Sequence, residues 1–176
     1  MSSSTPLSLQ SSDFALFALP QQFAQDGQQL DAAWKRLQAQ THPDKFAAEG
    51  AAAQRLAMQW SVRINEAYQR LKSPIKRAAY LCALAGVPID AERNTAMPTD
   101  FLMQQMQWRE ALDEAGRDED ALQALLDEAR AWQSAALTRC AALIDQAQDY
   151  AGAAGVVRQL LFVEKFLQEV RNRFPL

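Results

Sequence analysis

Two stretches with the apolar spacing of an α-helix flank a short segment that disfavours helix, and this arrangement restricts the fold more than any other feature of the sequence. The first predicted helix runs from about Asp26 to Gln40 and the second from about 48 to 71. Between them lie His42, Pro43 and Asp44, and Pro43 disfavours helical backbone angles at His42. Two helices with apolar stripes, joined by so short a loop, are expected to form an antiparallel pair.

The helices around this pair follow from local signals. We expect the serine-rich residues 1–12 to be flexible, and Asp13 to cap a short helix that Pro20 ends. Ser73 and Pro74 are typical of a cap and a first turn, so they predict a helix over residues 75–85. Residues 13–85 are therefore expected to form one helical module. The buried stripe of its central pair is expected to comprise Leu30, Ala33, Trp34, Leu37, Ala53, Leu56, Ala57, Trp60, Ile64, Ala67, Tyr68 and Leu71.

The second half of the sequence predicts a three-helix bundle over residues 99–174. Residues 86–98 lose the helical pattern and read as a linker. A helix capped by Thr99 or Asp100 should extend to Ala115, and a very long helix should begin at the acidic residues 118–120 and end near Tyr150. A turn marked by Gly152 and Gly155 should lead into a last helix over about 153–173. The sequence thus predicts an all-α protein with two modules.

Composition and charge exclude several classes of protein. The net charge of −3 argues against a general nucleic-acid binder, although the chain is uneven: residues 1–85 carry nine basic and six acidic residues, and residues 86–176 carry nine and fifteen. No apolar run is long enough to span a membrane. With one histidine and the two scattered cysteines Cys82 and Cys140, we expect no metal site and no cofactor. Buried free thiols indicate a reducing compartment, and hence a cytoplasmic protein.

The first helix of the bundle carries more apolar side chains than one buried face needs. At about 100° per residue, Phe101, Trp108 and Leu112 share one side, while Leu102, Met103 and Met106 fall away from it beside two glutamates. In the last helix Phe162 and Phe166 also lie off the stripe that contains Leu160. Two interpretations remain open: a partner-binding patch, or packing against the closing helix of the first module.

Residues 13–80 resemble a J-domain. The resemblance rests on His42-Pro43-Asp44, on Ile64-Asn65-Glu66-Ala67-Tyr68 with Leu71, and on Pro74, Arg77 and Tyr80. J-domains dock onto DnaK-type chaperones and stimulate their ATP hydrolysis, for which this tripeptide is required. The resemblance therefore implies a chaperone-binding surface made of Lys35, Arg36, His42, Pro43, Asp44 and Lys45.

The physical chemistry of the loop suits such a role. Pro43 stiffens the loop, so less conformational entropy is lost on docking, and Asp44 offers a carboxylate that an arginine of a partner could grip with two hydrogen bonds. A purely structural interpretation stays open, in which His42 bonds to the end of the preceding helix and Asp44 caps the next one.

The sequence from Phe101 to Glu114, together with Val157 to Phe162, is similar to the HscB family of co-chaperones in iron–sulfur cluster assembly. In that family the C-terminal bundle holds the scaffold protein IscU and presents it to the DnaK-like ATPase HscA. The resemblance implies a bacterial-type protein and a scaffold-binding surface made of Leu102, Met103, Met106, Glu110, Glu114 and Phe162.

These observations together predict a monomeric adaptor that is not an enzyme. It should stimulate the ATPase of an HscA-type or DnaK-type chaperone and deliver an IscU-type scaffold to it, assisting maturation of iron–sulfur proteins. One alternative is a general J-protein that brings unfolded clients to DnaK, which the acidic bundle disfavours because it lacks Cys-x-x-Cys repeats and a Gly/Phe-rich linker. The other is a small enzyme or redox protein that uses Cys140.

Overall fold

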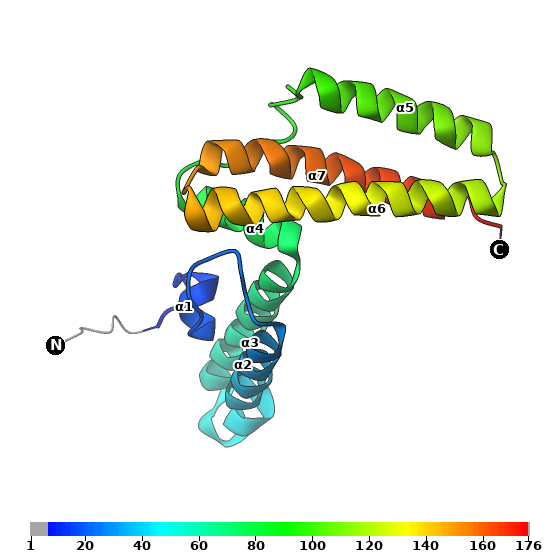
Figure 1. Cartoon of the computed structure of the whole chain (residues 1–176). Helices are drawn as coiled ribbons and strands as arrows, with labels where there is room; N and C mark the ends of the chain where they lie inside the picture. The colour runs from blue at the N-terminus through cyan, green and yellow to red at the C-terminus, as the bar shows by residue number, and fades with distance from the viewer. Residues whose placement is uncertain (1–6, 176) are drawn as a thin grey trace. The chain divides into compact units, whose positions relative to one another are not determined.

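Every regular element in residues 7–175, the part of the chain that the computed structural model describes, is a helix (Figure 1). The all-α prediction is therefore confirmed, whereas half of the expected flexible segment 1–12 lies outside the described residues. The elements in chain order are α1 Asp13–Phe17, α2 Gly27–Thr41, the 3-10 helix η1 Pro43–Glu49, α3 Ala51–Lys72, α4 Pro74–Leu84, α5 Thr99–Ala115, α6 Glu119–Ala141, the π-helical η2 Ala142–Gln146 and α7 Tyr150–Arg171.

The contacts divide the chain into two compact units, and the division falls within α4, between Arg77 and Ala78. It lies before the linker expected at residues 86–98, because the later part of α4 packs within the second unit. Cys82 of α4, for example, is fully buried, and its Sγ lies 3.6 Å from the carbonyl oxygen of Tyr150.

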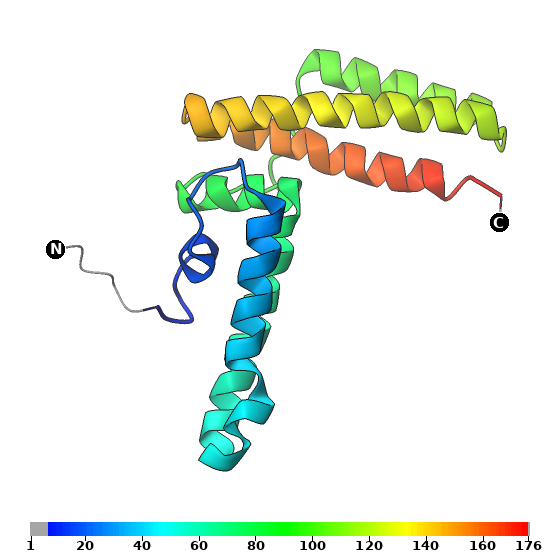
Figure 2. The ribbon, with the colours of Figure 1, turned by 60° about the horizontal axis from the view of Figure 1, so that its bottom comes forward.

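The first unit is built on α2 and α3, which lie side by side (Figure 2). Asp26 caps α2, since its Oδ1 accepts hydrogen bonds from the N–H groups of Gln28 and Gln29. Both helices bury the predicted side, including Leu30 and Ile64. Leu56 was expected in this core but is exposed, because it lies on the first turns of α3, at the rim of a surface hollow.

A buried carboxylate anchors the start of the first unit. The expectation that Asp13 caps α1 is wrong: Ser12 is the cap, and its Oγ accepts from the N–H of Ala15. The Asp13 side chain is fully buried, 2.8 Å from Arg63 and 2.6 Å from Arg70 of α3. These two ion pairs join residues that are far apart in the sequence and hold α1 against α3.

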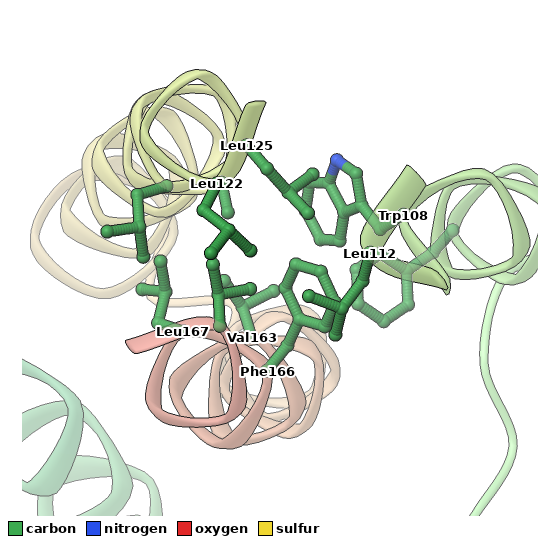
Figure 3. Close-up of a cluster of buried hydrophobic side chains, with 11 residues drawn as sticks. Trp108, Leu112, Leu122, Leu125, Val163, Phe166 and Leu167 are labelled. Carbon is green, nitrogen blue, oxygen red and sulfur yellow. The ribbon is translucent and has the colours of Figure 1, made fainter. Parts of the chain in front are cut away.

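The second unit contains a bundle of α5, α6 and α7 around a continuous apolar core (Figure 3). Trp108 of α5 and Phe166 of α7 stack at its centre, with ring centroids 5.3 Å apart and planes inclined by 11°. The prediction that Phe166 lies off the buried stripe is therefore wrong. The buried side chains of α7 spread over a wide arc, from Ala154 and Val157 to Phe166 and Val170, so its buried face is broader than a single stripe.

The chain reverses between α6 and α7 earlier than the glycines predict. α6 loosens into η2, Gln148 adopts a left-handed φ of 51°, and Asp149 then caps α7 by accepting the N–H of Gly152 at 2.9 Å. Gly152 thus lies in the first turn of α7, and the turn signal expected at Gly152 and Gly155 is wrong. A Cβ at Gly152 would meet the Asp149 carboxylate, so a larger residue there would require this side chain to shift.

Candidate functional site

The His42 loop forms directly at the end of α2. His42 ends the helix in extended conformation, as expected for a residue before proline, and Pro43 starts η1. The Nδ1 atom of His42 accepts the N–H of Asp44 at 3.3 Å and lies 3.5 Å from its carboxylate. With Nδ1 turned toward Asp44, Nε2 is the ring nitrogen left to face a partner. The loop therefore presents an N–H donor and a carboxylate side by side, and both side chains are exposed.

The predicted basic residues lie close to this loop. Lys35 and Arg36 are exposed on the last two turns of α2. Lys45 is exposed in η1, and its N–H donates to the carbonyl oxygen of His42. The structure thus gathers the predicted cations and the tripeptide at one end of the first unit.

Polar contacts further from the loop fix α2 and α3 against each other. Trp34 stacks on Tyr68 at 4.8 Å and donates its indole N–H to Asn65. Asp31 accepts hydrogen bonds from Lys72 at 2.6 Å and from Tyr68 at 2.8 Å, and these bonds lower the pKa of Asp31. Asn65 and Tyr68, which belong to the motif that resembles a J-domain, therefore act here by fixing one helix on the other.

An apolar hollow of about 410 Å³ lies beside the loop, and the sequence did not reveal it. Thr41 and Phe46, which flank the tripeptide in sequence, line one part of it, and Leu37, Leu56 and Trp60 line another. Leu56 follows the helical period of the core, so its spacing alone gave no sign that it is exposed.

The outward face of α5 carries the second group of predicted residues: Leu102, Met103, Met106, Glu110 and Glu114. Leu102 is 44% exposed, Met103 59% and Met106 65%. Both glutamates are exposed one to three turns further along the helix. The prediction that these apolar side chains lie off the core is confirmed, and the face combines apolar and acidic groups.

Phe162, the remaining residue of the predicted scaffold-binding surface, comes from another helix than the rest of the set. It lies on α7, is half-buried, and meets the ring of Phe101 edge to face at 5.9 Å. Only part of its ring is accessible beside the start of α5.

Neither cysteine offers a reactive thiol. Cys82 and Cys140 are free and buried, and burial raises the pKa of both thiols, that of Cys140 to about 12. A thiol held protonated at neutral pH is a poor nucleophile. Among the described residues no group of three or more His, Cys, Asp or Glu side chains could hold a metal ion. No helix in residues 7–175 has the length and apolar character needed to cross a membrane.

Comparisons with known proteins agree over nearly the whole chain. A co-chaperone protein HscB homolog from Burkholderia multivorans is 54% identical over 166 residues, which covers 93% of this chain and 94% of that protein. Its counterpart in Burkholderia mallei is 52% identical over the same shares. The family described as HSCB C-terminal oligomerisation domain matches residues 97–171.

Two solved structures are similar to the chain. Chaperone HscB from Vibrio cholerae superposes with a TM-score of 0.79 at 35% identity, over 92% of this chain and 96% of that one. Human co-chaperone protein HscB superposes with a TM-score of 0.87 over 93% of this chain and 82% of that one; at 23% identity this likeness shows the fold alone.

Proposed function

Because the chain belongs to the HscB family of co-chaperones, we propose that it stimulates the ATPase of an HscA-type chaperone and delivers an IscU-type scaffold protein to it. In this role it assists the maturation of iron–sulfur proteins. The observation that carries the proposal is the presence of two exposed surfaces of different chemistry, one in each compact unit.

The surface at the end of α2 is the docking site for the chaperone in this proposal. Lys35, Arg36 and Lys45 supply positive charge, which speeds association with an acidic partner. His42 and Asp44 supply a donor and an acceptor on a loop stiffened by Pro43, so that little conformational entropy is lost on binding. The apolar hollow beside the loop adds surface that a partner can bury. We assign this J-domain role to residues 13–85.

The outward face of α5 is the proposed docking site for the scaffold. Exposed methionines adapt to the shape of a partner and are common at binding surfaces. Leu102 and the two methionines form an apolar strip that the bundle itself does not need, since Trp108 and Leu112 already fill the core side of the helix. Glu110 and Glu114 can pair with basic side chains of the scaffold. Holding both partners on one chain raises their effective concentration toward each other.

The chaperone surface is tested by steady-state ATP hydrolysis of an HscA-type chaperone with its IscU-type scaffold, with and without the full chain. We expect His42→Gln to abolish the stimulation and to leave scaffold affinity unchanged, because the loop lies in the other compact unit from α5. Gln40→Ala, an exposed neighbour on α2, is the control and should stimulate normally. Equal stimulation by His42→Gln would contradict the docking assignment.

The scaffold surface is tested by calorimetric titration of the same scaffold. Replacing Leu102 and Met106 with alanine should weaken binding at least tenfold, or about 1.4 kcal/mol, with no change in melting temperature. Phe162→Ala is a less clean test, because that ring is half-buried against Phe101. Met58→Ala in α3 is the matched control, since Met58 is 59% exposed, like Met103. A large loss of melting temperature in the double variant would show that these side chains stabilise the bundle instead.

A further inference from the structure

A polar cleft of about 530 Å³ opens in the second unit beside the N-terminal half of α5, and neither proposed surface uses it. Side chains from all three helices of the bundle line it. They include Asp100, Phe101 and Gln104 of α5, Trp132 and Arg139 of α6, and Gln159 of α7.

Gln159 is the feature that first points to a ligand. Its side chain lines the cleft, the residue is only 9% exposed, and its amide forms no hydrogen bond to another residue within 7–175, while its polar atoms stay accessible from the cleft. Amide groups in a protein core are normally hydrogen-bonded, so the Gln159 amide depends on solvent or on a ligand in the cleft for its partners. The buried indole N–H of Trp108, by contrast, has a partner within the bundle, since it donates to Glu128 at 2.9 Å. The Gln159 amide is therefore available to a group that enters the cleft.

Arg139 supplies a positive charge in the same cleft. Its guanidinium carbon lies 5.5 Å from the centre of the Trp132 ring, which it covers. Arg139 forms no ion pair with an acidic side chain in the described part of the chain. A guanidinium stacked on an aromatic ring keeps its N–H groups free at the edge, in the fork geometry that matches a carboxylate.

Asp100 places a negative charge in the same cleft, but its carboxylate is engaged by its own helix. Its Oδ1 accepts the N–H of Phe101 at 2.9 Å, so the carboxylate is turned onto the first turn of its own helix. Gln104 likewise donates its amide to Glu128. The donors left for a ligand are the Arg139 guanidinium and the Gln159 amide, and both suit a carboxylate.

We propose that this cleft binds a carboxylate side chain of the same scaffold protein that occupies the outward face of α5. The inference rests on the proposed function for the identity of that partner. The two regions adjoin at one edge, because Met103 lies about 60° around α5 from Asp100. A protein that covers the apolar strip therefore reaches the mouth of the cleft.

The cleft also gives the binding surface a direction. The positive group, Arg139, lies beside the N-terminal half of α5, while Glu110, Asp113 and Glu114 lie in its C-terminal half. At about 1.5 Å per residue, the two regions are roughly 15–20 Å apart along the helix. A scaffold with an acidic group and a basic group at this spacing fits in one orientation, and the reverse orientation places like charges together.

Calorimetric titration of the full-length protein with the IscU-type scaffold of the same organism tests this inference. Arg139→Gln should weaken binding about fivefold or more at low salt and less at high salt, since charge pairs are screened. Arg130→Gln is the matched control: Arg130 is an exposed arginine of α6, 3.6 Å from Asp127, and its loss removes the same charge. The inference is overturned if both variants bind with the affinity of the unmodified protein, or if the two weaken binding equally.

Gln159→Glu provides a second test that changes almost no volume. The new carboxylate would take the place of the scaffold's carboxylate next to Arg139, so it should also weaken binding about fivefold. If Arg139→Gln lowers the melting temperature, its weaker binding could come from instability, and the Gln159→Glu variant then serves as the test. Unchanged scaffold affinity in a folded Gln159→Glu protein overturns the inference. If the unmodified chain does not bind the scaffold at all, the proposed function itself fails. Normal binding by the unmodified chain and by both cleft variants refutes only the cleft.

Discussion

Replacing Phe166 with alanine tests whether this side chain belongs to the core of the bundle. Phe166 is buried, stacks on Trp108 at 5.3 Å, and lies 5.8 Å from the Arg109 guanidinium. Truncating a buried phenylalanine costs about 3–5 kcal/mol, because apolar contacts are lost and a cavity remains. A stacked aromatic pair contributes about 0.5–1.5 kcal/mol beyond its buried area, so we place the loss in the upper part of that range, at about 4 kcal/mol. That is a large share of the roughly 5–15 kcal/mol that stabilises a typical domain.

The measurement is urea unfolding followed through the indole N–H signals in nuclear magnetic resonance. Trp108 and Trp132 report on the bundle, while Trp34 reports on the first unit, so the transitions need not coincide. With a denaturant slope of about 2 kcal/mol per molar urea, Phe166→Ala should lower the Trp108 midpoint by roughly 2 M.

Met106→Ala is the control for this experiment, because Met106 is 65% exposed and its loss should change the free energy of unfolding by less than about 0.5 kcal/mol. A loss below about 1 kcal/mol for Phe166→Ala, or an equal loss in both variants, would refute the assignment of Phe166 to the core.

Three further changes test other parts of the structure. Asp13→Asn should destabilise the first unit by about 3–5 kcal/mol, because it leaves two arginines facing a neutral side chain; an unchanged Trp34 midpoint in urea would contradict this. Burial raises the pKa of Cys140 to about 12, while an unfolded thiol titrates near pH 8.5. The contribution of Cys140 to the free energy of unfolding should therefore be fully present below about pH 8.5 and be lost as pH rises toward 12. Cys140→Ser should reduce that decline, as measured by urea titrations at several pH values. Ala18→Gly should raise the melting temperature of the first unit by relieving a left-handed φ of 52°, a gain of about 0.5–1 kcal/mol; a lower melting temperature would show that the Ala18 methyl group is needed.

Local signals in the sequence were sufficient for most of the helices and for the exposed strip. The cap at Asp26, the break at Pro43 and the first-turn proline at Pro74 act within a few residues, so their effect is read directly from spacing. The exposure of Met103 and Met106 was also predictable, since Trp108 and its neighbours already account for one full side of α5.

Features that depend on distant partners were not predictable in this way. Asp13 looked like a helix cap because nothing nearby shows that Arg63 and Arg70 meet it from α3. Phe166 was predicted to lie off the buried stripe, because the spacing of apolar residues in one helix does not show how much of its circumference the neighbouring helices cover. The polar cleft beside α5 was not predictable for the same reason: Arg139 and Gln159 lie on different helices, and only packing shows that they line one cleft.

The turn between η2 and α7 links two positions that look independent in the sequence. Asp149 caps α7 by bonding the N–H of Gly152, and its carboxylate occupies the space that a Cβ of residue 152 would need. Gly152→Ala should therefore require the Asp149 carboxylate to move, and its effect should be smaller once Asp149 has been replaced, which makes the two substitutions non-additive. Over evolutionary time the two positions should therefore change together, because a larger residue at 152 requires a different placement of the carboxylate at 149.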